Sequence, residues 1–347
     1  MAAERLPDRF RDEEHLEEFM SEPPPDLVEM MKRLDGDLAI LGIGGKMGVT
    51  LGREAVRAAK AAGVKKRILG VSRFSDEDAR RKLEAWGLET LACDLLDREA
   101  VARLPACPNV IFMAGRKFGT TGDSSLTWAM NTLVPGHVAE HYRESRIVAF
   151  STGNVYPLMP VKSGGATEGT PTEPVGEYAQ STLGREKIFS HFSLRNGTPV
   201  AIIRLNYAID MRYGVLYEIA RKVWSGAPVD LSMGHANVIW QGDANTQALL
   251  ALEHCASPAN LLNVTGPETL SVRFAAEAFG RLFDKPPRLE GQERDTALLN
   301  NASKAAKLFG YPRVPLLKMI EWVADWVKSG GRDIGKPSHF ETRDGKF

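Results

Sequence analysis

The sequence is short of the features that mark secreted, membrane-spanning and nucleic-acid-binding proteins. Its three cysteines, Cys93, Cys107 and Cys255, lack the close spacing of a zinc site or a disulfide framework. Lys plus Arg and Asp plus Glu each number 44, so no net charge attracts nucleic acid or an anionic membrane. The longest apolar runs are only strand-sized, and residues 1–20 are charged throughout. We therefore expect a cytoplasmic protein with reduced thiols and no nucleic-acid or membrane partner.

The sequence also lacks the motifs of a metal site and of a P-loop. Its seven histidines include one pair at four-residue spacing, His137 and His141, but no neighbouring carboxylate completes a metal motif. A P-loop needs Ser or Thr after Gly-Lys to hold magnesium, whereas Gly45-Lys46 is followed by Met47. Neither kind of site is expected.

What the chain does contain is an alternation of short apolar runs with longer amphipathic segments. The runs include Leu38–Leu41 and Val110–Met113, and the segments between runs include Met47–Ala62 and Ser125–Arg143. Strand-length runs separated by helix-length segments indicate right-handed crossovers, which place the strands in a parallel sheet with helices on both faces. An α/β fold with a doubly wound parallel sheet is therefore predicted.

This pattern divides the chain into four parts. Residues 1–35 combine an acidic segment, a proline run and a short helical pattern, which predicts a helical appendage on the main domain, with a partner-binding arm as the alternative. The alternation occupies residues 36–206. It loosens over residues 207–328, which should form mainly a smaller C-terminal lobe, with some strands returning to the sheet. Residues 329–347 are rich in glycine and charge and are expected to form a surface tail.

A glycine-rich loop follows the first predicted strand and opens the next helix. It runs through Gly42, Gly44, Gly45, Lys46, Met47 and Gly48. In the spacing Gly-x-x-Gly-x-x-Gly, the glycines permit a tight turn, close backbone approach to a pyrophosphate, and packing of helix on strand. The anion would lie at the helix N-terminus, where unpaired amides and the helix dipole favour negative charge. Residues 36–206 are therefore predicted to be a Rossmann-type domain that binds a nicotinamide dinucleotide.

The end of the second strand bears on the choice between NAD and NADP. A carboxylate there binds the ribose 2′-hydroxyl of NAD, whereas an arginine accepts the 2′-phosphate of NADP. The strand ends in Ser72-Arg73, which favours NADP, although Asp76 and Asp78 are close enough to keep NAD open. An ordinary solvated charge is the other interpretation of Arg73.

Further motifs appear in an order that resembles the extended short-chain dehydrogenase/reductase family, also called the NAD-dependent epimerase/dehydratase family, over residues 37–328. After the glycine loop they are Asp94-Leu95, Ala114-Gly115, Asn131, Ser151-Thr152-Gly153-Asn154-Val155-Tyr156, Tyr178 and Arg204-Leu205-Asn206-Tyr207. The resemblance implies that Asp94 and Leu95 contact the adenine, and that Ala114 and Gly115 line the cofactor site.

The resemblance also implies the catalytic residues. In the family a Ser or Thr and a Tyr hydrogen-bond the reacting oxygen, and a lysine four residues after the Tyr holds the nicotinamide ribose and lowers the phenol pKa. Thr152 and Tyr178 match the first two roles, with Asn131 in the helix before them, but the lysine position is Thr182, which carries no charge. An ammonium near a phenol favours the phenolate, so the substitution bears directly on acid/base chemistry.

Other cations could compensate for Thr182. Lys187 lies nine residues after Tyr178, near the opposite face of the helix, so it cannot substitute through the same turn. Lys117 or Arg116, just beyond the fourth strand, could supply the charge from another element; a solvated loop charge is the alternative for both.

The substrate side of the site is less constrained by motif. The residues expected there are Asn154, Asn206, Tyr207, Trp240 and Arg294. Trp240 fits a hydrophobic core equally well. The arginine that nucleotide-sugar enzymes of the family carry before Val238 is replaced here by His235-Ala236-Asn237, which weakens the case for a nucleoside-diphosphate sugar. Arg294 could still meet an anionic substrate.

These features predict an NAD(P)-dependent oxidoreductase, epimerase or dehydratase that acts on a hydroxyl or ketone of a sugar-like small molecule by hydride transfer. An enzyme of this fold without net redox change is included in that prediction. The alternative, from Thr182, is a dinucleotide-binding protein with little turnover, such as a redox-responsive regulator. A homodimer is compatible with the sequence.

Overall fold

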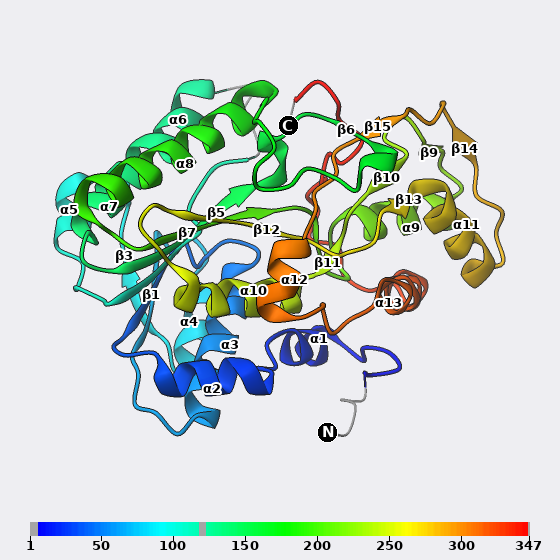
Figure 1. Cartoon of the computed structure of the whole chain (residues 1–347). Helices are drawn as coiled ribbons and strands as arrows, with labels where there is room; N and C mark the ends of the chain where they lie inside the picture. The colour runs from blue at the N-terminus through cyan, green and yellow to red at the C-terminus, as the bar shows by residue number, and fades with distance from the viewer. Residues whose placement is uncertain (1–5, 118–122, 346–347) are drawn as a thin grey trace.

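A seven-stranded parallel sheet forms the centre of the computed structural model, which describes residues 6–117 and 123–345 (Figure 1). The strand order is β12-β7-β5-β4-β1-β2-β3, and every neighbouring pair is parallel. The strands are β1 (Leu38–Leu41), β2 (Ile68–Ser72), β3 (Glu89–Ala92), β4 (Asn109–Phe112), β5 (Arg146–Thr152), β7 (Val200–Leu205) and β12 (Asn260–Val264). The predicted Rossmann-type, doubly wound fold is confirmed.

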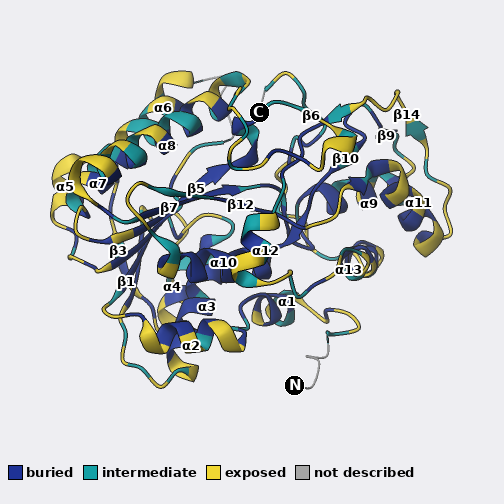
Figure 2. Ribbon diagram, viewed as in Figure 1, coloured by how far each residue is buried: buried dark blue, intermediate teal, exposed yellow. Residues whose placement is uncertain are grey.

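Helices cover both faces of this sheet because successive strand side chains point to opposite sides. Leu38 and Ile40 pack against one group of helices, and Ala39 and Leu41 against the other. The first group comprises α2 (Pro25–Arg33), α3 (Gly48–Ala61), α4 (Glu77–Trp86) and α10 (Gln241–Leu250), and the second comprises α5 (Arg98–Ala102), α7 (Val134–His141) and α8 (Gly176–Asn196). Figure 2 shows the strands buried between helices whose outer faces are exposed.

The C-terminal lobe has a hydrophobic core of its own. Its main helices are α9 (Val215–Ser225), α11 (Val272–Phe283) and α13 (Leu316–Lys328), joined by short strands that include β8 (Ala208–Ile209), β9 (Val229–Asp230), β14 (Leu289–Glu290) and β15 (Thr296–Ala297). The chain also returns to the main sheet, since β12 pairs with β7. None of the described helices is long and apolar enough to cross a membrane.

The N-terminal segment is divided between the two cores. Phe10 and the α1 helix (Glu13–Met20) bury their apolar side chains in the core of the C-terminal lobe, whereas Leu27, Met30 and Met31 of α2 join the core of the sheet. The described part of the expected appendage, residues 6–35, is therefore built into both halves of the molecule.

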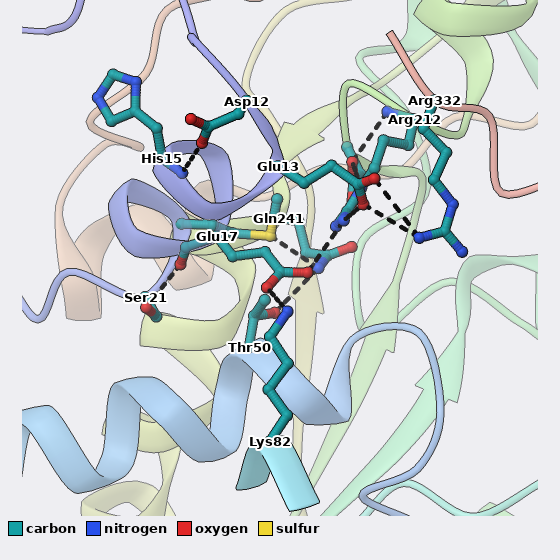
Figure 3. A network of polar contacts seen from close by, with 12 residues as sticks. Asp12, Glu13, His15, Glu17, Ser21, Thr50, Lys82, Arg212, Gln241 and Arg332 are labelled. Atoms are coloured by element: carbon teal, nitrogen blue, oxygen red, sulfur yellow. Dashed lines mark hydrogen bonds and ion pairs between the residues drawn. The ribbon is translucent and has the colours of Figure 1, made fainter. Parts of the chain in front are cut away.

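A buried cluster of charges reinforces this junction (Figure 3). Arg212 donates to Asp210 at 2.8 and 3.0 Å, to Glu13 at 2.9 Å and to Glu17 at 3.0 Å. Glu17 also pairs with Lys82 of α4. Asp210 is fully buried, and Arg212 holds its pKa below the ordinary value although burial by itself would raise it. The cluster links α1 to both lobes.

The C-terminal tail lies mostly at the surface but is anchored by two buried residues. Ser338 and Phe340 are buried, with exposures of 1% and 0%. The Ser338 amide donates to Glu218 of α9, and Arg343 donates to the Thr296 carbonyl at 2.8 Å. Charge and glycine content do not reveal that single residues such as Phe340 anchor a segment whose other described residues are exposed or partly exposed.

The charge cluster generates a stability prediction. Arg212→Met should lower the free energy of unfolding by about 3 to 5 kcal/mol, because it leaves Asp210 as an uncompensated buried charge. Arg332→Met is the matched control, since Arg332 also contacts Glu13 but its side chain is 70% exposed, and exposed pairs contribute about 0 to 1 kcal/mol. Urea unfolding followed by circular dichroism measures the free energy of unfolding of both variants. Equal losses of stability in the two variants would contradict the stabilising role of the buried Arg212 contacts.

Candidate active site

A groove runs along the carboxyl ends of the sheet strands, where loops from several strands converge. It consists of two adjoining cavities, of about 250 and about 380 Å³, which share Gly42, Gly45, Met113 and Gly115. The smaller cavity lies beside β2 and β3. The larger one lies between β5, the first turn of α8 and the segment around β8, so it faces the C-terminal lobe.

The glycine loop forms the floor of this groove. Gly42 has a φ of +91°, and a Cβ there would lie 2.5 Å from the Ala114 amide nitrogen, so both conformation and packing require glycine. A Cβ at Gly48 would lie 2.3 Å from the Ile43 carbonyl oxygen. Gly45 differs, because a Cβ there would meet only the Gly42 carbonyl oxygen, at 3.4 Å, and would project where the groove needs space.

The loop has the form of an anion cradle. Helix α3 begins at Gly48 with Met47 as N-cap and with no side-chain cap, which leaves its first amides available to a diphosphate. The open space at Gly45 fits a dinucleotide laid across the loop, as the sequence predicted. A resident nicotinamide dinucleotide therefore suits this groove.

The smaller cavity brings together the residues that the sequence assigns to the adenosine. Ser72, Arg73, Asp94, Leu95 and Ala114 line the smaller cavity, together with Gly44. Arg73 is exposed at its rim. Asp76, the residue that kept NAD open, is the N-cap of α4, where its carboxylate accepts from the amides of Asp78 and Ala79.

Thr152 and Tyr178 meet in the larger cavity. Thr152 ends β5 and Tyr178 stands in the first turn of α8. Burial raises the pKa of Tyr178, while hydrogen bonds with Thr152 and Thr182 and the charge of Arg185 oppose that rise. Thr182 is fully buried and its hydroxyl donates to the Tyr178 carbonyl at 2.7 Å. It offers no charge to the phenol.

A buried ion pair holds α8 in this orientation. Arg204 of β7 makes a bidentate pair with Glu186, with nitrogen to oxygen distances of 2.7 and 2.9 Å. Ser151 of β5 also donates to Glu186, and Arg204 donates to the Tyr156 hydroxyl at 2.7 Å. The pair raises the pKa of Arg204 despite its burial. Helix α8 is thus tied to both β5 and β7.

The substrate side is built from three segments of the chain. Asn154, Asn206 and Tyr207 line the larger cavity, as expected, and Lys336 and Ser338 of the tail complete it. Lys117 lies over the Tyr178 ring, with its Nζ 5.9 Å from the ring centroid, and donates to the Ser338 carbonyl at 3.0 Å. Burial lowers the pKa of Lys117 to about 8.

Lys46 has a place that the glycine motif did not predict. Its ammonium lies 4.0 Å from the centroid of the Tyr213 ring and donates to the Ala208 carbonyl at 3.3 Å. Burial lowers its pKa to about 7. Lys46, expected only at the cofactor, therefore also lines the substrate side.

Two expected substrate residues lie elsewhere. Trp240 is fully buried in the C-terminal core, with its ring 5.6 Å from Trp322 and 6.1 Å from Phe10, so it has no surface for a substrate. Arg294 is exposed between β14 and β15 and does not line either cavity. Trp240 therefore follows the core alternative, and Arg294 is not placed at the groove, because sequence position in the lobe does not specify direction toward it.

Arg116 and Asn131, two other residues expected near the site, contact each other through the Arg116 backbone. The Arg116 side chain faces Asp123, with 3.6 Å between nitrogen and oxygen, while its backbone is hydrogen-bonded to Asn131. Asn131 is fully buried and accepts from Arg185 at 2.6 Å. Arg185 was missed; the available signal was its spacing of seven residues from Tyr178, which returns to the same helix face.

Comparison with known proteins agrees with the fold. The sequence profile of the NAD dependent epimerase/dehydratase family matches residues 40–209. The structure resembles the UDP-Glc/GlcNAc 4-epimerase of Campylobacter jejuni, with 20% identity, 85% of this chain and 100% of the other covered, and a TM-score of 0.70. No curated protein matches the sequence.

Two other solved structures are similar to this chain and contain a bound dinucleotide. The UDP-glucose 4-epimerase of Thermus thermophilus, in complex with NAD, has 20% identity over 84% of this chain and 99% of its own, with a TM-score of 0.67. WbmG of Bordetella bronchiseptica, in complex with NAD and UDP, has 19% identity over 87% and 98%, with a TM-score of 0.69. Residues 40–209 are therefore assigned to the NAD-dependent epimerase/dehydratase family, a family of enzymes.

Proposed function

We propose that the chain is an NAD(P)-dependent enzyme that interconverts a hydroxyl and a ketone on a sugar-like substrate, as an epimerase, dehydratase or oxidoreductase. The observation that carries this is the placement of Thr152 and Tyr178 in one cavity that continues into the dinucleotide groove. A hydroxyl and a phenol side by side can hydrogen-bond one substrate oxygen and move its proton.

Each residue has a defined task in this proposal. Thr152 donates to the reacting oxygen and orients it, and Tyr178 takes the proton from a substrate hydroxyl or returns it to a ketone. A nicotinamide dinucleotide held by the glycine loop would supply the hydride acceptor or donor. Asn154 and Asn206 offer amides to further hydroxyl groups of the substrate. The tail and Lys117 border the cavity and are joined by the hydrogen bond from Lys117 to the Ser338 carbonyl.

The lining favours a substrate with an anionic group. Lys46, Lys117 and Lys336 all border the larger cavity. The lowered pKa values of Lys46 and Lys117 would rise when an anion enters, since a nearby negative charge favours the ammonium. We therefore propose a sugar-like acid, a sugar phosphate or a nucleotide sugar, of which the last resembles the substrates named for the similar epimerases.

The direct test of catalysis is a substrate panel assayed with either cofactor. Sugar nucleotides, sugar phosphates, sugar acids and neutral sugars are incubated with the enzyme and analysed by mass spectrometry and NMR for oxidation, epimerisation or loss of water.

Tyr178→Phe should lower turnover about a hundredfold or more, the contribution typical of general acid/base groups. Tyr311→Phe, at a 76% exposed tyrosine, is the control. Unchanged turnover in Tyr178→Phe would exclude this mechanism, and no turnover on any class would favour the dinucleotide-binding regulator.

The glycine loop provides a test of cofactor binding. Gly45→Val should abolish binding of NAD and NADP in calorimetry without unfolding the protein, since its Cβ has ordinary contact at 3.4 Å. Gly136→Val, at a glycine with no atom within 4 Å of its Cβ, should bind normally. Gly42→Val should instead destabilise the fold, because its Cβ would overlap the Ala114 backbone. Undiminished binding in Gly45→Val would remove the loop from the cofactor site.

Arg73 supports a preference for NADP over NAD. Asp76, the carboxylate that could bind the ribose of NAD, is instead engaged as the N-cap of α4. A charge-assisted contact with the 2′-phosphate is worth about 1.5 to 3 kcal/mol, or about tenfold to a hundredfold in affinity. Arg73→Ala should lose that factor for NADP and leave NAD unchanged. Arg81→Ala, on the exposed side of α4, is the matched control. Equal affinity of the unaltered protein for both cofactors would disprove the preference.

A further inference from the structure

Arg185 continues a line of side chains that begins at Tyr178. Steps of four and seven residues at about 100° each return to nearly the same direction, so Tyr178, Thr182 and Arg185 lie along one side of α8. Long side chains on a helix lean toward its N-terminus. Arg185 therefore extends back over the small Thr182 toward the catalytic end of the helix.

The guanidinium of Arg185 lies where the cofactor groove meets α8. Its Nη1 donates to the Phe150 carbonyl of β5 at 2.8 Å, and its Nη2 donates to Asn131 Oδ1 at 2.6 Å. A Cβ on Gly115 would lie only 2.2 Å from Nη2. Because Gly115 lines both cavities of the groove, the charge stands directly behind the cofactor site.

This charge has little compensation from the protein. Arg185 is 6% exposed and its Nε is a buried donor with no hydrogen-bond partner among the described residues. The negative charges that would stabilise it are the Tyr178 phenolate and, more weakly, Glu186, whose carboxylate is already paired with Arg204. Burial lowers the pKa of Arg185 to about 10, so it remains a cation at neutral pH. A buried, poorly compensated cation costs stability, and such groups cluster at functional sites.

Asn131 connects this cation to the loop after β4. Its Oδ1 also accepts from the Arg116 amide at 3.0 Å, and its Nδ2 donates to the Arg116 carbonyl at 3.1 Å and to Ser181 Oγ at 2.9 Å. It lies in a π-helical turn, Ala129–Leu133, a local feature that is frequent at functional sites. Arg185 thus fixes the amide orientation of a residue that joins α8 to the groove.

We propose that Arg185 is the positioning cation of this active site, and that it supplies from one turn further along α8 the charge that Thr182 cannot provide. It favours the Tyr178 phenolate and holds Asn131 against the loop that borders the cofactor. The proposal rests on the proposed function in one respect, that Tyr178 is the acid/base group. Lys117 is the competing cation, since it also lies near the Tyr178 ring.

The pKa of the Tyr178 phenol distinguishes the effect of Arg185 from that of Lys117. The groups that face its phenol are Thr152 from β5, Thr182 and Arg185 from α8, Lys117 from the loop after β4, and Tyr207 and Tyr213 from the substrate side. Of these, Arg185 and Lys117 are the cations. An opposite charge within about 4 to 6 Å lowers the pKa of an acidic group by about 1 to 3 units, so removal of the effective cation should raise the pKa of Tyr178 by about one unit or more.

The experiment follows the ionisation of Tyr178 in the full-length protein by fluorine NMR. The chain is labelled with 3-fluorotyrosine, which ionises at lower pH than tyrosine, and the Tyr178 signal is assigned by its loss in Tyr178→Phe. Titrations compare the unaltered protein with Arg185→Met, Arg185→Lys, Lys117→Met and the double variant Thr182→Lys/Arg185→Met. Arg185→Gln, which keeps an amide donor, replaces Arg185→Met if the latter does not fold. No turnover is needed, so this result is independent of whether a substrate has been found.

The expected set of Tyr178 pKa values depends on a positive charge at the position of the Arg185 guanidinium. Arg185→Met should raise the pKa of Tyr178 by about one unit or more, Arg185→Lys should stay near the unaltered value, and the double variant should return toward it. A folded Arg185→Met, or Arg185→Gln, with an unchanged Tyr178 pKa would overturn the proposal, because a merely structural role alters stability but not this titration. A larger rise in Lys117→Met than in the Arg185 variant would overturn it as well and assign the charge to Lys117.

Discussion

The ion pair between Glu186 and Arg204 is the interaction on which the active site depends. Helix α8 has a mixed set of buried residues, among them Ser181, Thr182 and Arg185, so no continuous apolar stripe sets its rotation. The bidentate pair, supported by Ser151, supplies that constraint from β5 and β7. A rotation of the helix by one residue, about 100°, would remove Tyr178 from Thr152 and Arg185 from Asn131. Burying the Glu186–Arg204 pair costs free energy, but the pair specifies a single orientation of α8.

Both ends of the chain contribute to the same region of the molecule. Helix α1 reaches Arg212 beyond β8, next to the strand whose Ala208 carbonyl accepts from Lys46. The tail contributes Lys336 and Ser338 to the cavity and is held by α9 and β15. The substrate side is therefore assembled from segments that are distant in sequence, and its shape depends on how the two lobes are joined.

The sequence was sufficient wherever local rules apply. The glycine spacing after β1 predicted the turn at Gly42, because the backbone conformation and the packing on Ala114 exclude any other residue. Motif order predicted that Thr152 and Tyr178 would lie together, and both line one cavity. It left open the direction of Trp240 and Arg294 and did not reveal the anchoring of the tail at Phe340, since a side chain in a lobe can face either its core or its surface, and only packing decides between them.

By itself, then, the sequence determined the parallel α/β fold, the dinucleotide loop and the absence of the lysine four residues after Tyr178, because each follows from periodicity or from residue identity at a fixed spacing. Only the tertiary structure decided which cation stands in that place. Arg185 is one of many arginines in the chain, and its importance arises when β4, β5 and the π-helical turn enclose its guanidinium with Asn131 and Gly115. Electrostatic influence depends on distance and burial, and neither is set until distant segments have packed.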